Sequence, residues 1–172
     1  DVSDIPSSER LRLERGDFRI ISYEWGVTYA GMLLASEVTG DEKYADYTFD
    51  RMKFLAEIRP HVVEFEKRHQ GGRHPLNSVL HPRALDDAGS MCAAMIKAED
   101  AGLHADLSPM IHTYIDHISE DQYRLDDGTL ARHRPQPSTL WLDDLFMSVP
   151  ALAQMGKYAG EHQYFDDAVR QV

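Results

Sequence analysis

Apolar residues near the start of the chain recur at three- and four-residue steps, the spacing that places side chains on one face of a helix. Between residues 23 and 38 these positions are Val27, Ala30, Gly31, Leu34 and Val38. The pair Thr39-Gly40 then supplies a stop signal, and Asp41 offers an N-cap for a second run that lasts until Pro60. The pattern predicts helices at 23–38 and 41–60, joined by a very short turn as a hairpin.

The same pattern occurs twice more along the chain. It predicts helices at 87–101 and 105–118, and then at 141–158 with a partner in the closing stretch EHQYFDDAVRQV. Glycines stop the three first helices, and the turn sequences TGDEKYADYTF and AGEHQYFDDAV resemble each other closely. The sequence therefore predicts an all-α protein made of three copies of one helical hairpin.

The connections between the hairpins are long and irregular, whereas the turns inside them are short. A solenoid of the tetratricopeptide type repeats about every 34 residues, with short links throughout, and therefore fits the longer repeat and long connections of these hairpins poorly. The pattern favours a helical toroid in which first helices form an inner ring, second helices form an outer ring and long loops gather at one mouth. We expect residues 20–172 to form about half of such a ring, a smaller bundle being the alternative, and polar residues 1–19 to form a mobile N-terminal segment.

Charge and composition narrow the function classes. The 172 residues include 29 acidic and 18 basic side chains, a net charge of -11 without a basic cluster, so the surface should repel nucleic acid. No apolar stretch reaches the roughly 20 residues that span a bilayer, so no membrane partner is expected. The one cysteine, Cys92, lies in the apolar run SMCAAMI and is expected to be a buried thiol, which leaves the location open.

Acidic residues gather where the first helices of the hairpins should begin. Counted back from the turn glycines, Trp25, Asp87 and Asp144 occupy equivalent positions, so YEWG, LDDAG and WLDD should meet at one mouth. An aspartate at a helix start is often only a cap or a partner of the helix dipole. Paired carboxylates can also hold different protonation states, which makes an acid and a base available for catalysis.

The neighbouring aromatic residues suit a sugar ligand. The rings of Tyr23, Trp25 and Trp141 could pack on a sugar, whereas Phe146 fits a protein core better. The loop LARHRPQ adds Arg132 and His133, which could bind the carboxylate of an acidic sugar or simply form a solvated loop.

Metal and cofactor sites are not indicated. His74, His81 and His133 show none of the tight helical spacing of zinc motifs. The sequence also contains no serine nucleophile elbow, phosphate loop or dinucleotide fingerprint. We therefore predict no metal and no cofactor.

The chain from about residue 20 to 172 resembles glycoside hydrolase family 105, the unsaturated rhamnogalacturonyl hydrolases, and more distantly the unsaturated glucuronyl hydrolases of family 88. The resemblance rests on YEWGVTYAGMLLASEVTGDEKYADY, LDDAGSMCAAMIKA, DGTLARHRP and LWLDDLFMSVPALAQMGKYAGEHQYFDDAVRQV. It implies a six-hairpin (α/α)6 barrel in a bacterial enzyme of the cytoplasm or periplasm, with the remaining half of the barrel supplied by a longer chain.

The resemblance also implies a reaction. These enzymes remove a 4,5-unsaturated uronic acid from the non-reducing end of oligosaccharides produced by polysaccharide lyases. An aspartic acid protonates C4 of the vinyl ether, water adds at C5, and the resulting hemiketal opens, so the usual rules for two-carboxylate glycosidases do not apply in their ordinary form. Two alternatives stay open: another sugar enzyme on this scaffold, such as an epimerase or ordinary glycosidase, and a noncatalytic carbohydrate-binding helical module.

Residue roles follow from matching the family's motifs. Asp143 in WLD would be the general acid and then the base toward water. Asp87 fits the D-x-G spacing of the second carboxylate, and Asp86 fits the alternative alignment. The substrate-binding residues expected in addition are Trp25, Asp86, Arg132, His133, Trp141 and Asp144, with an unsaturated uronyl oligosaccharide as ligand.

Overall fold

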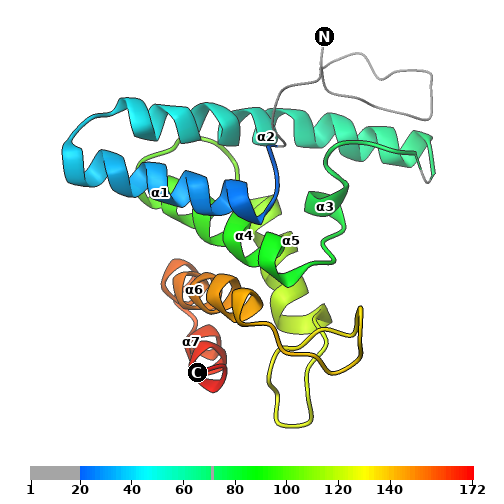
Figure 1. Ribbon diagram of the computed structural model, residues 1–172. Coiled ribbons are helices and arrows are strands. Elements are labelled where there is room, and N and C mark those ends of the chain that lie inside the picture. The colour runs from blue at the N-terminus through cyan, green and yellow to red at the C-terminus, as the bar shows by residue number, and fades with distance from the viewer. Residues whose placement is uncertain (1–19, 71) are drawn as a thin grey trace.

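The computed structural model describes residues 20–70 and 72–172, so the mobile segment predicted for residues 1–19 lies outside the described part (Figure 1). The elements in chain order are α1 (Tyr23–Thr39), α2 (Lys43–Arg68), α3 (Asn77–Leu80), α4 (Leu85–Asp100), α5 (Ser108–Asp116), the π-helix η1 (His117–Asp121), α6 (Leu142–Ala159) and α7 (His162–Arg170). Within the described residues, β-structure is limited to isolated bridge positions, among them the bridges Arg124–Leu130 and Arg132–Thr139. The all-α prediction is confirmed.

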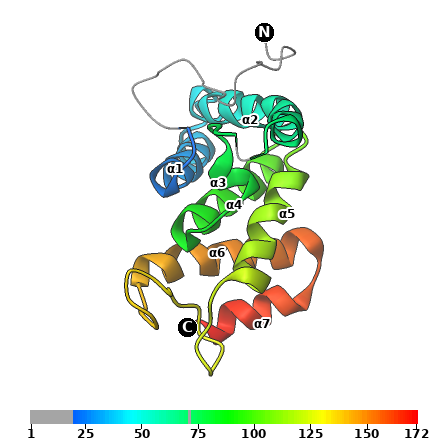
Figure 2. The same cartoon turned by 90° about the vertical axis from the view of Figure 1, so that its right-hand side faces the viewer.

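The helices form three hairpins, α1 with α2, α4 with α5, and α6 with α7. Helix α4 packs against both α1 and α6, and it lies between them in both views (Figures 1 and 2). The first helices of the hairpins thus stand side by side, as the inner layer of a helical toroid requires. The short turns lie at one end of this layer and the long connections, 69–84 and 122–141, lead to the other end.

Two glycines allow the first helices to approach closely. A Cβ added to Gly26 of α1 would lie 2.5 Å from Ser90 of α4, and one added to Gly89 of α4 would lie 2.5 Å from the backbone of Met147 in α6. A side chain at either position would hold the helices apart. These contacts bring the three helix starts together.

Helix α4 forms the centre of the core. Every residue from Ala88 to Ile96 is buried, including Cys92, as expected. Burial raises the pKa of the Cys92 thiol to about 12, so it stays protonated at neutral pH. Within the described chain, no helix has the length and apolar character needed to cross a membrane.

The predicted end of the second helix at Pro60 is wrong. Helix α2 continues through Pro60 to Arg68, although a proline removes one backbone hydrogen bond and costs about 3 kcal/mol. Beyond the proline, Val62 and Phe65 are fully buried and continue the apolar stripe of Met52 and Leu55. Burying each of these large side chains contributes roughly 1.5–3 kcal/mol, which offsets the cost of the proline.

The boundaries of the next elements also differ from the pattern. Helix α5 begins at Ser108 instead of residue 105, because Pro109 suits the first turn of a helix. It ends at Asp116 and widens into η1, and the four-residue helix α3 interrupts a connection that was expected to be irregular. Such short elements carry little periodicity to detect.

Candidate active site

The three first helices present equivalent positions at the mouth end. Their first residues are Tyr23, Leu85 and Leu142. Trp25, Asp87 and Asp144 are therefore each third in their helix, as the count from the turn glycines predicted. The second residue is acidic in all three helices, namely Glu24, Asp86 and Asp143.

Three carboxylates from two helices come together at this end. One carboxylate oxygen each of Asp86, Asp143 and Asp144 lies within 4.8 Å of the others. Their surroundings differ: Asp143 is exposed, Asp86 is 15% exposed and Asp144 is 1% exposed. Such a group of oxygen ligands could hold a cation. Asp86, Asp143 and Asp144 are called the carboxylate cluster from here on.

The helix starts themselves support negative charge in the cluster. The amide of Asp144 donates to Oδ1 of Asp143 at 3.0 Å, and the amide of Asp87 donates to Oδ1 of Asp86 at 2.8 Å. First-turn amides have no partner within their own helix and carry the positive end of its dipole. The sequence pattern Asp-Asp thus creates the same local arrangement in α4 and α6.

Arg132 supplies a positive charge to the carboxylate cluster. Its guanidinium donates to Asp144 from Nε at 2.5 Å and from Nη2 at 2.7 Å, and Nη2 also donates to Asp86 at 3.1 Å. Backbone bonds with Thr139 fix the loop on which Arg132 sits, and its guanidinium carbon lies 4.1 Å from the centre of the Trp141 ring. The aromatic ring therefore packs directly on the ion pair.

The pKa values of this pair reflect burial and pairing. Burial, opposed by the hydrogen bonds from Arg132, raises the pKa of Asp144. Hydrogen bonding to Asp144 raises the pKa of Arg132, so the guanidinium remains charged. A buried carboxylate held by both ends of an arginine fork is fixed in position, which suits support of the site better than proton transfer.

Asp87 and Trp25 lie toward α1. Oδ1 of Asp87 accepts a hydrogen bond from the amide of Tyr23 at 2.6 Å and so ties α4 to the start of α1. The ring of Trp25 packs against Tyr29 and Tyr47, with centroid distances of 5.5 Å and 6.4 Å. The structure therefore includes Asp86 in the carboxylate cluster and places Asp87 at the contact between α1 and α4.

Tyr23 and Glu24 bring α1 into the site. The negative charge of Glu24 first, and those of Asp86 and Asp143 to a lesser degree, raise the pKa of the Tyr23 hydroxyl. Negative charges from all three first helices thus act on this phenol. The sequence analysis missed Glu24, although counting back from the turn glycines would have aligned it with Asp86 and Asp143.

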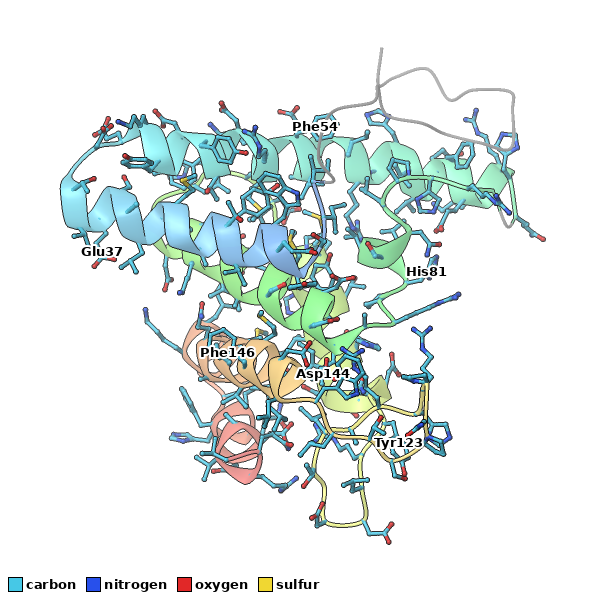
Figure 3. All side chains as sticks on the ribbon, in the orientation of Figure 1. Glu37, Phe54, His81, Tyr123, Asp144 and Phe146 are labelled. Carbon is cyan, nitrogen blue, oxygen red and sulfur yellow. The ribbon has the colours of Figure 1, made fainter. Side chains whose placement is uncertain are left out.

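The remaining predicted residues lie beside the cluster. Trp141 is 41% exposed and precedes the first residue of α6, and His133 packs its ring on Tyr123 at a centroid distance of 4.5 Å. Figure 3 shows Asp144 at the start of α6 and Tyr123 in the neighbouring loop region. His133 also lines an open cavity of about 930 Å³ that begins at Arg132.

Helical hairpins whose first helices form one layer and start at one mouth are the architecture of the α/α-barrel class. Comparison with known proteins gives its family. Residues 5–172 match the sequence model of Glycosyl Hydrolase Family 88, so the chain belongs to that family, and it is a glycoside hydrolase for unsaturated uronic acid substrates. No curated protein gave a significant match to the chain.

Proposed function

We propose that this enzyme removes a 4,5-unsaturated uronic acid from the non-reducing end of lyase-generated oligosaccharides by hydrating the vinyl ether, as the family 105 hydrolases that its sequence resembles do. Asp143 gives its proton to C4. Water then adds to the positively charged C5 and returns one proton to the Asp143 carboxylate. The C5 hemiketal opens, which frees C1 to release the remaining sugar.

One observation carries this proposal: an exposed carboxylate, Asp143, stands in the carboxylate cluster at a helix start. The cluster places carboxyl groups, which can give or accept a proton, within reach of one bound sugar. Asp143 is the most exposed of the three carboxylates and therefore the one most open to the substrate. A general acid also needs room for the substrate, which the cavity beyond Arg132 extends.

The other residues take supporting roles in this proposal. Asp86 is the second carboxylate, because it belongs to the cluster whereas Asp87 binds the Tyr23 amide. Trp141 offers an exposed ring for the sugar, and Arg132 keeps Asp144 and Asp86 in place. The second carboxylate holds the protonated state of the acid or binds a sugar hydroxyl.

The test follows the ultraviolet absorbance of the unsaturated uronyl group in lyase digests of rhamnogalacturonan, ulvan and glycosaminoglycans. The protein should remove this absorbance, and the digest consumed fastest identifies the polysaccharide. Asp143→Asn should slow the reaction by about 10²–10⁴-fold, the usual contribution of general acid–base catalysis. The matched control is Asp166→Asn on α7, an exposed aspartate remote in sequence from these helix starts.

Either of two results would contradict the proposal. One is a folded Asp143→Asn variant that retains the parental rate, as expected for an enzyme that uses other groups. The other is a folded, complete protein that leaves every digest unchanged. Comparing Asp86→Asn with Asp87→Asn then assigns the second carboxylate, since loss at Asp87 should act mainly through the contact between α1 and α4.

A further inference from the structure

The open cavity beside the carboxylate cluster is lined by residues outside that cluster. Its walls are formed by residues 82–85 at the start of α4, the first and last residues of η1 with the two residues that follow it, and the loop 132–135. Arg132 belongs to both places, because it lines the cavity and also binds Asp144 and Asp86. None of the three clustered carboxylates lines the cavity. It therefore adjoins the proposed reaction site without containing it.

This cavity is basic, although the protein carries a net charge of -11. Arg83 and Arg134 line it with exposed side chains, and within the part of the chain that the structure describes neither forms an ion pair. The acidic residue in the lining is Asp121. Nη2 of Arg134 donates to the backbone oxygen of Arg83 at 3.4 Å, which holds the two loops together. Two guanidinium groups in the lining of one cavity suit a carboxylate or a sulfate.

A buried histidine adds an unused polar atom to the cavity wall. His117 is 8% exposed, and among the described residues its buried Nε2 has no hydrogen-bond partner. Burial, against the opposing charge of Asp121, lowers the pKa of His117, so the ring is neutral and can bond an uncharged group. It is the first residue of the π-helix η1, and single π-turns often occur at functional sites. The rings of Tyr123 and His133, which pack at an interplanar angle of 57°, supply a further surface for a sugar.

We propose that this cavity is a subsite for a negatively charged group, a sulfate ester or a carboxylate, on the sugar that follows the unsaturated uronic acid. The proposal rests on the function proposed above. Because the reacting sugar is the non-reducing end and lies at Asp143, the rest of the substrate extends in one direction only. Arg132 is already engaged by two carboxylates, so Arg83 and Arg134 bind the anion, and His117 binds a neighbouring hydroxyl or ester oxygen.

The test uses two unsaturated disaccharides that differ only by a sulfate on the second sugar, and a second pair that differs there by a carboxylate. The measured variants are Arg83→Gln with Arg134→Gln, and His117→Gln. The control combines Lys53→Gln and Lys97→Gln, which removes two exposed positive charges from α2 and α4. We expect the double arginine variant to lower kcat/KM about 10- to 100-fold for one of the charged substrates, mainly through KM, and to leave the uncharged substrate unchanged. The control should alter neither.

Three outcomes would overturn the subsite. Equal losses on charged and uncharged substrates would mean that the arginines bind the carboxylate of the uronic acid itself, which both substrates share. If the double arginine variant consumed every substrate at the parental rate, the subsite proposal would be contradicted and the proposed function would stand. If the parent protein consumed none of the disaccharides, both the subsite proposal and the proposed function would be contradicted. Because Arg83 and Arg134 are exposed, their variants should fold even if His117→Gln does not.

Discussion

Replacing Gly89 with alanine should push α4 and α6 apart at the point where they assemble the carboxylate cluster. The added Cβ would lie 2.5 Å from the carbonyl carbon and oxygen of Met147 and 2.8 Å from the amide nitrogen of Ser148. These are backbone atoms of a helix, so no rotamer change can relieve the clash. Ordinary contact begins at 3.4 Å, and the two helices must therefore separate locally by about 0.9 Å.

The magnitude follows from two opposing effects. Overpacking of this kind costs about 1–3 kcal/mol, and contact with rigid backbone favours the upper part of that range. Alanine in a helix interior returns about 1 kcal/mol relative to glycine. We expect a net loss of about 2 kcal/mol in the free energy of unfolding. Displacement by about 1 Å can also cost 10²-fold in rate, because Asp86 and Asp143 lie on the two separated helices.

The assay is urea unfolding followed by circular dichroism, together with turnover of the unsaturated uronyl group. The control is the same substitution at Gly31 of α1. Among the described residues, its added Cβ would meet no atom within 4 Å outside the local helix backbone, and the variant should gain about 0.5–1 kcal/mol. Opposite signs at the two positions test the packing argument directly. If Gly89→Ala were as stable and as active as the parent, α4 and α6 could not approach each other as closely as described.

Three further predictions concern buried groups. Asp144→Asn should lower the free energy of unfolding, measured by urea titration, by about 3–5 kcal/mol, because it leaves the Arg132 charge partly unpaired. The double variant Asp144→Asn with Arg132→Met should recover part of this loss. Burial alone would raise the pKa of Asp167, but hydrogen bonds from Arg124 lower it. The pair therefore stabilises the fold at pH values above the ordinary aspartate pKa of about 4, and this stabilisation is lost as the pH falls through the lowered pKa of the native protein. Urea titrations of the parent and Asp167→Asn at several pH values should therefore converge in acid; a constant difference would refute this. Cys92 should not react with a thiol reagent until the protein unfolds, and rapid labelling of the native protein would contradict its burial.

The hairpin architecture could be predicted because its signals are local. Apolar steps of three and four residues mark each buried helix face, and the glycines that end α1 and α6 adopt the left-handed conformation that stops a helix. The same turns set the register of the helix starts, which explains why Trp25, Asp87 and Asp144 were correctly aligned. Local signals failed at Pro60, where burial further along α2 outweighs the proline.

The details of the site depend on tertiary contacts that no local pattern encodes. The D-x-G spacing favoured Asp87 as the second carboxylate, which stays a prediction, and this spacing could not show that Oδ1 of Asp87 accepts a hydrogen bond from the Tyr23 amide of α1. Phe146 was expected in the core and is 70% exposed in the described chain. Arg132 could be expected to bind an acidic group, whereas only the folded loop shows that Asp144 and Asp86 occupy it.

Four aspartates with nearly identical local sequence thus acquire different chemistry from their surroundings. Asp86 and Asp143 accept an amide bond within their own helix start, so helix geometry alone gives them the same local stabilisation. Their neighbours separate the roles, because Arg132 binds Asp144 and Asp86 and leaves Asp143 exposed to solvent. Asp87 meanwhile fixes the adjacent helix. The role proposed for Asp143 requires a carboxylate that can both give and accept a proton. The start of α6 suits this proposed role, because Asp144 and Asp86 bind the arginine while Asp143 stays exposed.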